Sequence, residues 1–209
     1  MELNRRDLIA KGIALGVITL APNLNPSALA EAWLQTEKKP RTPTPPNDFG
    51  PFYMRNAPNA AVLRAANDPG MPLTVNGAVY SVNGDILPGA KIEIWQTDYS
   101  GHYDLNGYRY RTALVAASSG KYEFSSVIPG HYPGRVCQHI HFAVTAEGHK
   151  PLVTQMYFAT DPVFDGDPDK NYTKDPLCTA RELVRPVVLL GDPQTVVASS
   201  NFELVLERL

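Results

Sequence analysis

The sequence predicts an all-β protein, a single antiparallel β-sandwich of about eight strands with long loops and little helix, or else a barrel of the same strands. Short runs in which apolar and polar side chains alternate recur beyond residue 70, which is the period of a half-buried strand. Turn residues are abundant, with 19 prolines and 15 glycines in 209 residues. No long helical period and no fixed-period repeat interrupts this pattern.

The strands are expected at residues 73–80, 90–96, 108–115, 121–124, 140–144, 152–158, 187–190 and 202–206. Turn signals at residues 83–85, 118–120 and 147–149 contain Asn-Gly-Asp, Ser-Ser-Gly and Glu-Gly-His. Residues 161–180 are rich in Asp, Pro and Gly, so we expect a long surface loop there. The last two runs are expected to close the domain as an edge hairpin.

Residues 1–30 resemble an export signal that is removed by cleavage. Arg5 and Arg6 precede an apolar run at residues 12–20, which is too short for a stable bilayer span, and residues 28–30 form a small-x-small cleavage site. The arginine pair is similar to that of twin-arginine signals. We therefore expect a periplasmic or extracellular protein, exported by the twin-arginine route, with no membrane contact after processing. An ordinary Sec signal and an uncleaved amphipathic anchor are the alternatives.

The remainder of the chain divides into a proline-rich arm at residues 31–47 and one domain at residues 48–209. The formal net charge is −2, so no basic excess indicates a nucleic-acid partner. Cys137 and Cys178 are the two cysteines, and outside the cytoplasm they could form a disulfide. We favour free or structural thiols over metal ligation, and the pairing stays open.

His139 and His141 lie two residues apart in an apolar run that is predicted to be a strand. Side chains at positions i and i+2 of a strand point to the same face, so the two imidazoles can bind one ion. An ordinary pair of half-buried polar residues is the alternative. The sequence lacks a zinc-protease helix motif, a four-cysteine zinc pattern, a phosphate-binding glycine loop and a Gly-x-Ser-x-Gly motif.

Tyrosine is the other candidate ligand near the histidine pair. Tyr132 precedes His139 in a Pro-Gly-rich segment, and Tyr103 follows the predicted strand at residues 90–96. A phenol with a pKa of about 10 is neutral at pH 7, but a strong Lewis acid can hold it as phenolate. Phenolate oxygens together with imidazoles favour Fe(III) over a thiophilic ion, and two phenolates stabilise the ferric state against reduction.

An ordered set of motifs resembles the intradiol ring-cleavage dioxygenases. It comprises Gly-Pro-Phe-Tyr at residues 50–53, Glu-Ile-Trp-Gln-Thr-Asp at 93–98, Gly-His-Tyr-Asp at 101–104, His-Ile-His-Phe at 139–142 and Thr-Gln-Met-Tyr-Phe at 154–158. The set covers roughly residues 48–160 in the family's order. Because no long helical segment precedes it, the chain is more similar to the protocatechuate 3,4-dioxygenase-type core than to the catechol 1,2-dioxygenases with a helical linker.

The resemblance implies a mononuclear non-haem Fe(III) held by Tyr103, Tyr132, His139 and His141. It also implies the cleavage of a small aromatic ortho-diol by O2 to a cis,cis-muconate-type diacid. Tyr132 is the ligand that the substrate would displace and that could then act as a base. Family members assemble as dimers or larger, so a homo-oligomer is among the expectations.

Two further residues carry over as catalytic candidates, Gln155 and Arg135. The family has an arginine three residues before the first histidine of the pair, whereas here Val136 holds that position and Arg135 lies four residues before His139. Either the segment bulges by one residue, or Arg109 or Arg111 takes the place of the family arginine. Trp95 is expected to be a core residue without a chemical role, and His102, His131 and His149 are expected to be solvated.

Two other functions remain open from the sequence. The Pro-Gly-Ala-x-Ile-x-Ile-Trp pattern at residues 88–95 also resembles transthyretin-like and carboxypeptidase-regulatory modules, which are non-enzymatic β-sandwiches that bind proteins or sugars. The displaced arginine is also consistent with a dioxygenase homologue that binds its metal without turnover.

Overall fold

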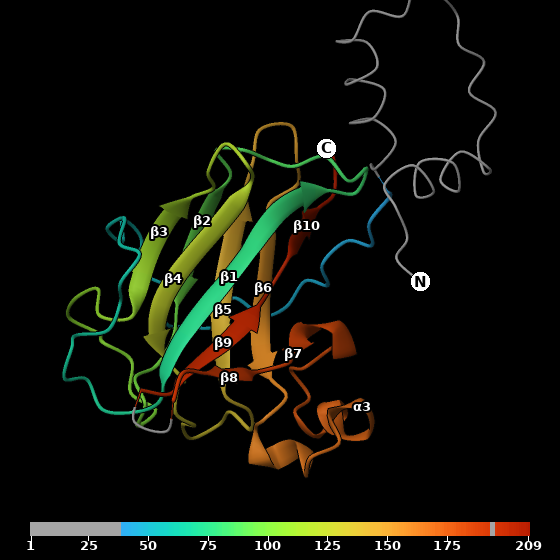
Figure 1. Cartoon of the computed structure of the whole chain (residues 1–209). Coiled ribbons are helices and arrows are strands. Elements are labelled where there is room, and N and C mark those ends of the chain that lie inside the picture. The colour runs from blue at the N-terminus through green and yellow to red at the C-terminus, as the bar shows by residue number, and fades with distance from the viewer. Residues whose placement is uncertain (1–38, 193–194) are drawn as a thin grey trace, which may run out of the picture. The chain divides into compact units, whose positions relative to one another are not determined.

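The computed structural model of the chain describes residues 39–192 and 195–209, which Figure 1 shows in colour. The expected signal peptide at residues 1–30 and the first part of the expected arm lie outside these ranges. No helix in the described ranges is long and apolar enough to cross a membrane.

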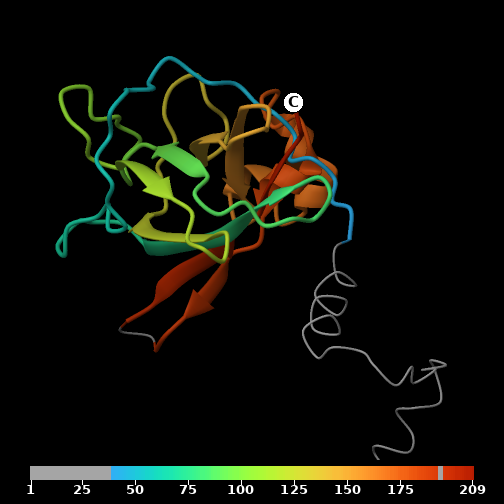
Figure 2. The ribbon, with the colours of Figure 1, turned by 90° about the horizontal axis from the view of Figure 1, so that it is seen from above.

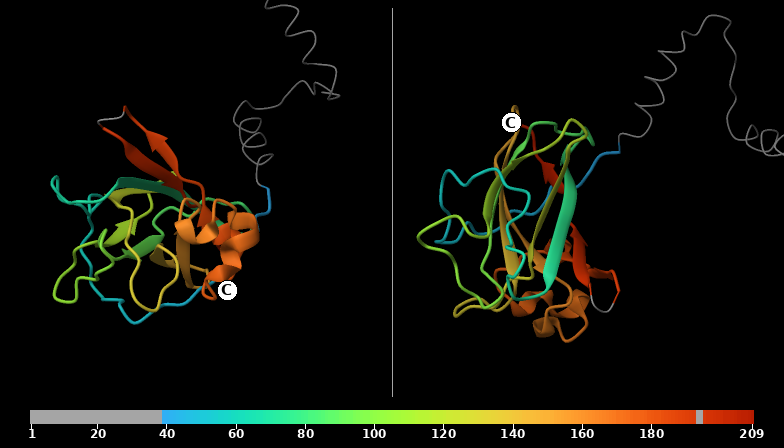
Figure 3. Two further views of the ribbon diagram at one scale, coloured as in Figure 1. Left: turned by 90° about the horizontal axis from the view of Figure 1, so that it is seen from below. Right: turned by 60° about the vertical axis from the view of Figure 1, so that its left-hand side comes forward.

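Two β-sheets lie face to face, as the right-hand view of Figure 3 shows. The first sheet is built on β1 (Pro72–Ser81), which pairs with β4 (Lys121–Val127), β9 (Val197–Asn201) and β10 (Leu204–Leu206), and β8 (Val188–Leu190) pairs with β9. The second sheet has the order β3 (Arg111–Val115), β2 (Lys91–Trp95), β5 (His139–Thr145), β6 (Leu152–Phe158) and β7 (Val184–Arg185). The predicted all-β sandwich is confirmed.

The pairing of the C-terminal strands differs from the expected edge hairpin. β8 forms its hairpin with β9, and β10 pairs with β1 instead. β9 and β10 run parallel to β1, and β7 runs parallel to β6, whereas the other pairs are antiparallel. Residues 197–201 contain Ser and Asn and little apolar periodicity, so the sequence pattern did not identify β9.

Alternation along β5 explains how one strand serves both the core and a site. Ile140, Phe142 and Val144 are buried between the sheets and belong to the apolar core. His139 and His141 point to the other face of the strand, because successive side chains alternate. Both histidines are nevertheless buried, with 3% and 1% of their surface exposed, so the outer face of β5 is covered as well.

Part of that cover comes from residues 39–60, the blue segment that runs across the body in Figure 2. This segment, which joins the described part of the expected arm to the first residues of the domain, is called the arm from here on. Its backbone forms neither helix nor strand and is hydrogen-bonded to the domain through the amides of Arg41, Thr44 and Asn47, which donate to the carbonyls of Val82, Val205 and Val153. The proline-rich composition suits an irregular segment, since proline has no amide proton to donate to a strand ladder. The arm therefore lies against the sandwich at these residues.

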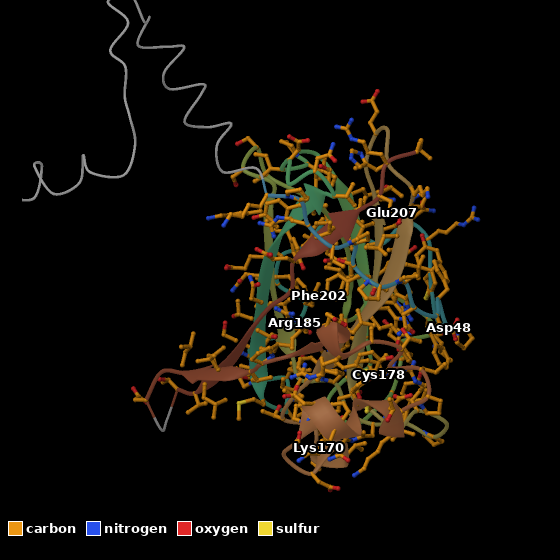
Figure 4. All side chains as sticks on the ribbon, turned by 90° about the vertical axis from the view of Figure 1, so that its right-hand side faces the viewer. Asp48, Lys170, Cys178, Arg185, Phe202 and Glu207 are labelled. Atoms are coloured by element: carbon orange, nitrogen blue, oxygen red, sulfur yellow. The ribbon has the colours of Figure 1, made fainter. Side chains whose placement is uncertain are left out.

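The segment after β6 is not the simple surface loop that its composition predicts. It contains the short helices η1 (Pro162–Phe164), α3 (Pro168–Asn171), η2 (Tyr172–Lys174) and η3 (Arg181–Leu183). In Figure 4, Lys170 lies at its outer end and Cys178 lies nearer the sheets. The segment turns inward at four buried side chains: Asp161, Phe164, Asp175 and Cys178. The expectation failed because proline and aspartate here cap short helices and bind buried backbone.

Candidate metal centre

Strand register places the predicted histidines opposite the predicted glutamine. His141 of β5 pairs with Gln155 of β6, and His139 pairs with Tyr157. On the other side of β5, Trp95 of β2 is the partner of His141. Because residues two apart share a face, these five side chains gather on the outer face of the second sheet.

The two tyrosines reach the same place from loops that touch one another. Tyr103 follows β2 and Tyr132 follows β4, and the two loops meet where Gly101 lies against the backbone of His131. A Cβ atom at Gly101 would lie 1.9 Å from the His131 carbonyl oxygen, and Gly101 has φ of +89°. Glycine therefore allows the loops to approach closely enough for both phenols to face β5.

Four rings then form a continuous cluster. The ring centroids of Tyr103 and Tyr132 are 5.6 Å apart, those of Tyr132 and His139 are 5.7 Å apart, and those of His139 and His141 are 4.9 Å apart. The structure therefore brings together all four predicted metal ligands. The described residues contain no group of three or more His, Cys, Asp or Glu side chains that could hold a metal, so phenols must complete any donor set here.

The arm closes the cluster from outside. Phe52 stacks on Tyr103 with 4.2 Å between ring centroids, and its carbonyl oxygen accepts a 2.6 Å hydrogen bond from Arg111. Gly50 has φ of +67° and lies against His141, where an added Cβ would be 3.1 Å from Cε1. The Gly-Pro-Phe-Tyr motif thus supplies a wall of the site.

The backbone sets the tautomer of His139. Its Nδ1 lies 2.8 Å from the Cys137 carbonyl oxygen, which can only accept, so Nδ1 carries the proton. The Nε2 lone pair then faces the cluster, where Arg135 Nη1 donates to it at 3.0 Å. This arrangement orients the ring as outer hydrogen bonds orient metal-binding histidines in general.

Electrostatics leave both imidazoles neutral and the Tyr103 phenol protonated. Burial, followed by the charge of Arg135, lowers the pKa of His139 to about 3, and burial lowers the pKa of His141 well below its usual value. Burial, and then the neighbouring phenol of Tyr132, raises the pKa of Tyr103. Neutral imidazoles are competent ligands, whereas Tyr103 needs a strong Lewis acid to lose its proton.

Two polar atoms in this cluster are buried without a hydrogen bond of normal length and angle among the described residues, the Tyr103 hydroxyl and His141 Nδ1. Burying an unsatisfied polar group costs about 1–3 kcal/mol. Both atoms belong to predicted ligands, and a cation bound by the cluster would remove the cost at the phenol oxygen. The donor set therefore fits a hard trivalent ion.

Arg135 reaches the site despite its shifted position in the sequence. Besides its contact with His139, its Nη2 donates to Gln155 Oε1 at 2.7 Å and to the Tyr157 hydroxyl at 3.2 Å. Gln155 in turn donates to the Asp48 carbonyl oxygen at 2.6 Å. Arg135 and Gln155 are thus linked directly, beside the histidine pair.

The alternative arginines are engaged elsewhere. Arg109 pairs with Asp68 at 2.7 Å with 49% of its side chain exposed. Arg111 is buried and holds the carbonyl oxygens of Phe52 and Asp104, with its guanidinium carbon 5.6 Å from the Tyr103 ring centroid. Arg111 joins the arm to the Tyr103 loop.

The three other histidines make no ring contact with the four-ring cluster that would place them among the candidate ligands. His102 is exposed, His131 contacts the Asp161 carboxylate at 3.1 Å, and His149 Nδ1 contacts the Glu147 carbonyl oxygen. His149 Nε2 is buried without a partner in the described part of the chain, so this ring is less solvated than expected. Both cysteines are buried and unpaired in the structure.

Sequence reasoning missed three contributors to the site. Trp95 is buried as expected, but it lies on the outer face of the sheet and stacks on His141 with 4.8 Å between centroids and 5° between planes. Cross-strand pairing of β2 with β5 was the signal that could have placed it there. Tyr157 and the buried carboxylate of Asp175, which lies 3.8 Å from Arg135, were not singled out.

Comparison with known proteins agrees with this arrangement. A family model described as "Dioxygenase" matches residues 49–208. The chain belongs to the intradiol ring-cleavage dioxygenase family. It is 31% identical over 147 residues to a chlorocatechol 1,2-dioxygenase of Rhodococcus opacus, covering 56% of this chain and 57% of that protein. It is 29% identical to a catechol 1,2-dioxygenase of Acinetobacter baylyi, covering 79% and 63%.

Solved structures of family members share the fold. The dioxygenase domain of a dioxygenase and carbohydrate-binding protein fusion from Streptomyces sp. SirexAA-E superposes with a TM-score of 0.68 at 30% identity, covering 80% of this chain and 100% of that one. An intradiol ring-cleavage dioxygenase of Tetranychus urticae shows the same fold at 22% identity and a TM-score of 0.65, covering 81% and 96%. The two curated relatives described above are longer, and the match covers only 57% and 63% of their length.

Proposed function

We propose that this family member is a ferric intradiol dioxygenase that cleaves a small aromatic ortho-diol of the catechol or protocatechuate type. The observation that carries the proposal is the cluster of two phenols and two neutral imidazoles on the outer face of β5. Cleavage would fall between the two hydroxyl-bearing carbons. Both atoms of O2 would enter the product, a cis,cis-muconate-type diacid.

Tyr103, Tyr132, His139 and His141 would hold a mononuclear non-haem Fe(III). When bound, the ion would supply Lewis acidity that keeps the phenols ionised and withdraws electron density from a bound diol. The buried Tyr103 hydroxyl without a partner and the preset tautomer of His139 support this choice of ligands. Hard anionic oxygen donors favour Fe(III) over softer ions.

Tyr132 is the residue that we assign to take a proton from the substrate. Its loop contains the exposed neighbours Pro133 and Gly134, whereas Tyr103 is stacked beneath Phe52. Tyr132, if no longer bound to the ion, would be the phenolate placed to take a proton from a diol hydroxyl as a general base. Tyr103 would then remain in place while Tyr132 moves.

Arg135 and Gln155 would orient the substrate and stabilise negative charge on its ring. The guanidinium is a fixed cation beside His139, and Gln155 keeps it there through a 2.7 Å hydrogen bond. Because Arg135 Nη1 donates to His139 Nε2, it would have to release this nitrogen for His139 to bind an ion. Its bonds to Gln155 and Tyr157 would hold it nearby.

We further propose that the protein is exported through the leader at residues 1–30 and degrades aromatic compounds outside the cytoplasm. The arginine pair, the apolar run and the small-x-small site support this setting. Assembly into a homo-oligomer is proposed on the family resemblance alone.

Metal analysis and a visible spectrum, recorded before and after adding catechol or protocatechuate, test the proposal. We expect one iron per chain, a burgundy colour from tyrosinate-to-iron charge transfer, a spectral change with the diol and O2 uptake. A colourless iron-replete protein that consumes no O2 with either diol would contradict the activity. Iron and colour without O2 uptake would instead identify a metal-binding homologue without turnover.

A further inference from the structure

The segment between Arg135 and His139 is one residue longer than in the family pattern, and two buried carboxylates hold it. The backbone amide of Cys137 donates to Asp175 Oδ2 at 3.1 Å, and that of Gln138 donates to Asp161 Oδ2 at 2.7 Å. Both carboxylates come from the segment after β6. The extra residue is therefore fixed in place by hydrogen bonds, not left as a free bulge.

Asp175 differs from Asp161 in one respect, its contact with the arginine. Asp175 Oδ2 lies 3.8 Å from Arg135 Nη2, and the side chains are only 2% and 6% exposed. Asp161 instead contacts His131, at 3.1 Å. A carboxylate is costly to bury without a cation, so Asp175 and Arg135 each require the other's charge.

The same arginine atom joins Asp175 to the candidate site. Nη2 also donates to Gln155 and Tyr157, while Nη1 points at His139. Asp175 is itself anchored, because its Oδ1 accepts from the amide of Leu177 at 2.9 Å and its carbonyl oxygen accepts from that of Cys178 at 2.9 Å. The Asp175 carboxylate is therefore held in place, and its contact with Arg135 fixes the orientation of the guanidinium.

We propose that Asp175 is a positioning residue that compensates for the one-residue displacement of Arg135 and holds its guanidinium beside the diol-binding site. The proposal rests on the proposed function and deepens it. Asp175 touches neither a candidate ligand nor the substrate, and it acts through Arg135. Its loss should misplace the cation without removing the iron ligands.

A double-mutant cycle in the iron-loaded full-length protein tests this role. We expect Asp175→Asn to lower kcat roughly ten- to hundredfold, with the KM for catechol within about twofold, because misplacement of a catalytic group by about 1 Å has effects of this size. In an Arg135→Met background the same substitution should change kcat less than about twofold. The visible band and iron content should stay unchanged.

Asp161→Asn is the matched control, since it removes a buried carboxylate from the same segment that binds the neighbouring amide but not Arg135. The factor by which Asp161→Asn changes kcat should be the same in the wild type and in the Arg135→Met background. Equal losses from Asp175→Asn in both backgrounds would overturn the proposal. If Asp175→Asn does not fold, Asp175→Glu takes its place, because it keeps the negative charge on a longer side chain. It is then compared in the wild type and in the Arg135→Met background.

Thermal unfolding of the metal-free proteins separates this proposal from the enzymatic one. If Asp175 and Arg135 are paired, the double variant should lose clearly less in melting temperature than the sum of the two single losses. Additive losses would overturn the pairing. An iron-loaded wild type without activity would contradict the proposed function, and the thermal cycle would still decide whether Asp175 holds Arg135.

Discussion

Single residues in the site are held by different means, and His139 and His141 illustrate this. The His139 ring is fixed by a hydrogen bond from Nδ1 to a backbone carbonyl. The His141 ring makes no hydrogen bond of normal length and angle at Nδ1 in the described chain, and it stacks on Trp95. One histidine is therefore oriented by a hydrogen bond, and the other by an aromatic face.

Replacing Tyr103 with phenylalanine removes a single oxygen atom and tests whether that oxygen is a ligand of the iron. Tyr103→Phe keeps the ring that stacks on Phe52 but removes the buried hydroxyl that has no partner in the described chain. We expect the iron affinity to fall by at least about 10²-fold, because even outer-shell changes cost 10–100-fold. Equilibrium dialysis with Fe(III) and the visible spectrum measure this loss.

Tyr108→Phe is the control for that substitution. The Tyr108 hydroxyl donates to the Arg55 carbonyl oxygen outside the site, and the residue is 39% exposed. It should retain iron and colour. Full iron binding by Tyr103→Phe would remove Tyr103 from the proposed ligand set.

The depressed pKa of His139 predicts how stability depends on pH in the metal-free protein. Its pKa is about 3 when folded, against 6.5 as the ordinary value, so between these values the unfolded chain binds more protons. The contribution of His139 to the free energy of unfolding is therefore fully present above pH 6.5. It is lost as the pH falls toward 3, by up to about 1.4 kcal/mol per pH unit.

Urea unfolding at a series of pH values measures this dependence. The free energy of unfolding should fall more steeply with acidification in the wild type than in His139→Gln. His102→Gln, which alters an 81% exposed imidazole, should follow the wild type. Identical slopes for the wild type and His139→Gln would show that His139 titrates normally.

At the scale of elements, the alternation of side chains along β5 and β6 accounts for most of the site that the sequence could predict. His139 and His141 share a face by alternation, and the register places Gln155 on that face. The motif order then linked Tyr103 and Tyr132 to the same strand. These parts were predictable because each depends on neighbours in sequence or on one strand pairing.

The parts that were not predictable depend on contacts across many residues. Asp175 reaches Arg135 from 40 positions away, through a segment whose proline and aspartate content indicated a surface loop. The parallel pairing of β9 with β1 likewise leaves no local signal in Ser-rich residues. Trp95 was correctly expected to be buried, but its contact with His141 follows from strand order, which periodicity does not specify.

The close contact between the arm and His141 can be tested by adding a methyl group at Gly50. Gly50→Ala should destabilise the fold by more than about 1–2 kcal/mol, since it adds a Cβ 3.1 Å from His141 Cε1 to the strain of a positive φ. Gly148→Ala is the matched control, with φ of +70° and nothing within 4 Å, so it should cost only the backbone strain.

Chemical unfolding and iron binding of both glycine variants give the comparison. Gly50→Ala should also weaken iron binding, because the added methyl group presses on a candidate ligand, whereas Gly148→Ala should bind iron normally. Equal destabilisation and equal iron affinity in the two variants would show that the arm does not constrain His141.

At the scale of the whole molecule, the sandwich core supports one face of β5 and the arm covers the other. Ile140 and Phe142 anchor the strand between the sheets, while Phe52 and Gly50 close over the histidine face. An ion bound there would join β5, two loops and, through the rings that cover it, the arm. Metal binding should therefore stabilise the entire fold rather than a single loop.

This coupling predicts a higher melting temperature for the iron-loaded protein. A ligand that binds only the folded state stabilises it by about 2.7 kcal/mol at a hundredfold excess over its Kd. For a domain of this size that shift corresponds to roughly 5–10 °C. Calorimetry before and after iron loading should show this increase, and chelation should reverse it. The double variant Tyr103→Phe/His141→Gln should melt at one temperature regardless of iron, and an unchanged melting temperature in a wild type that carries stoichiometric iron would place the metal outside the sandwich.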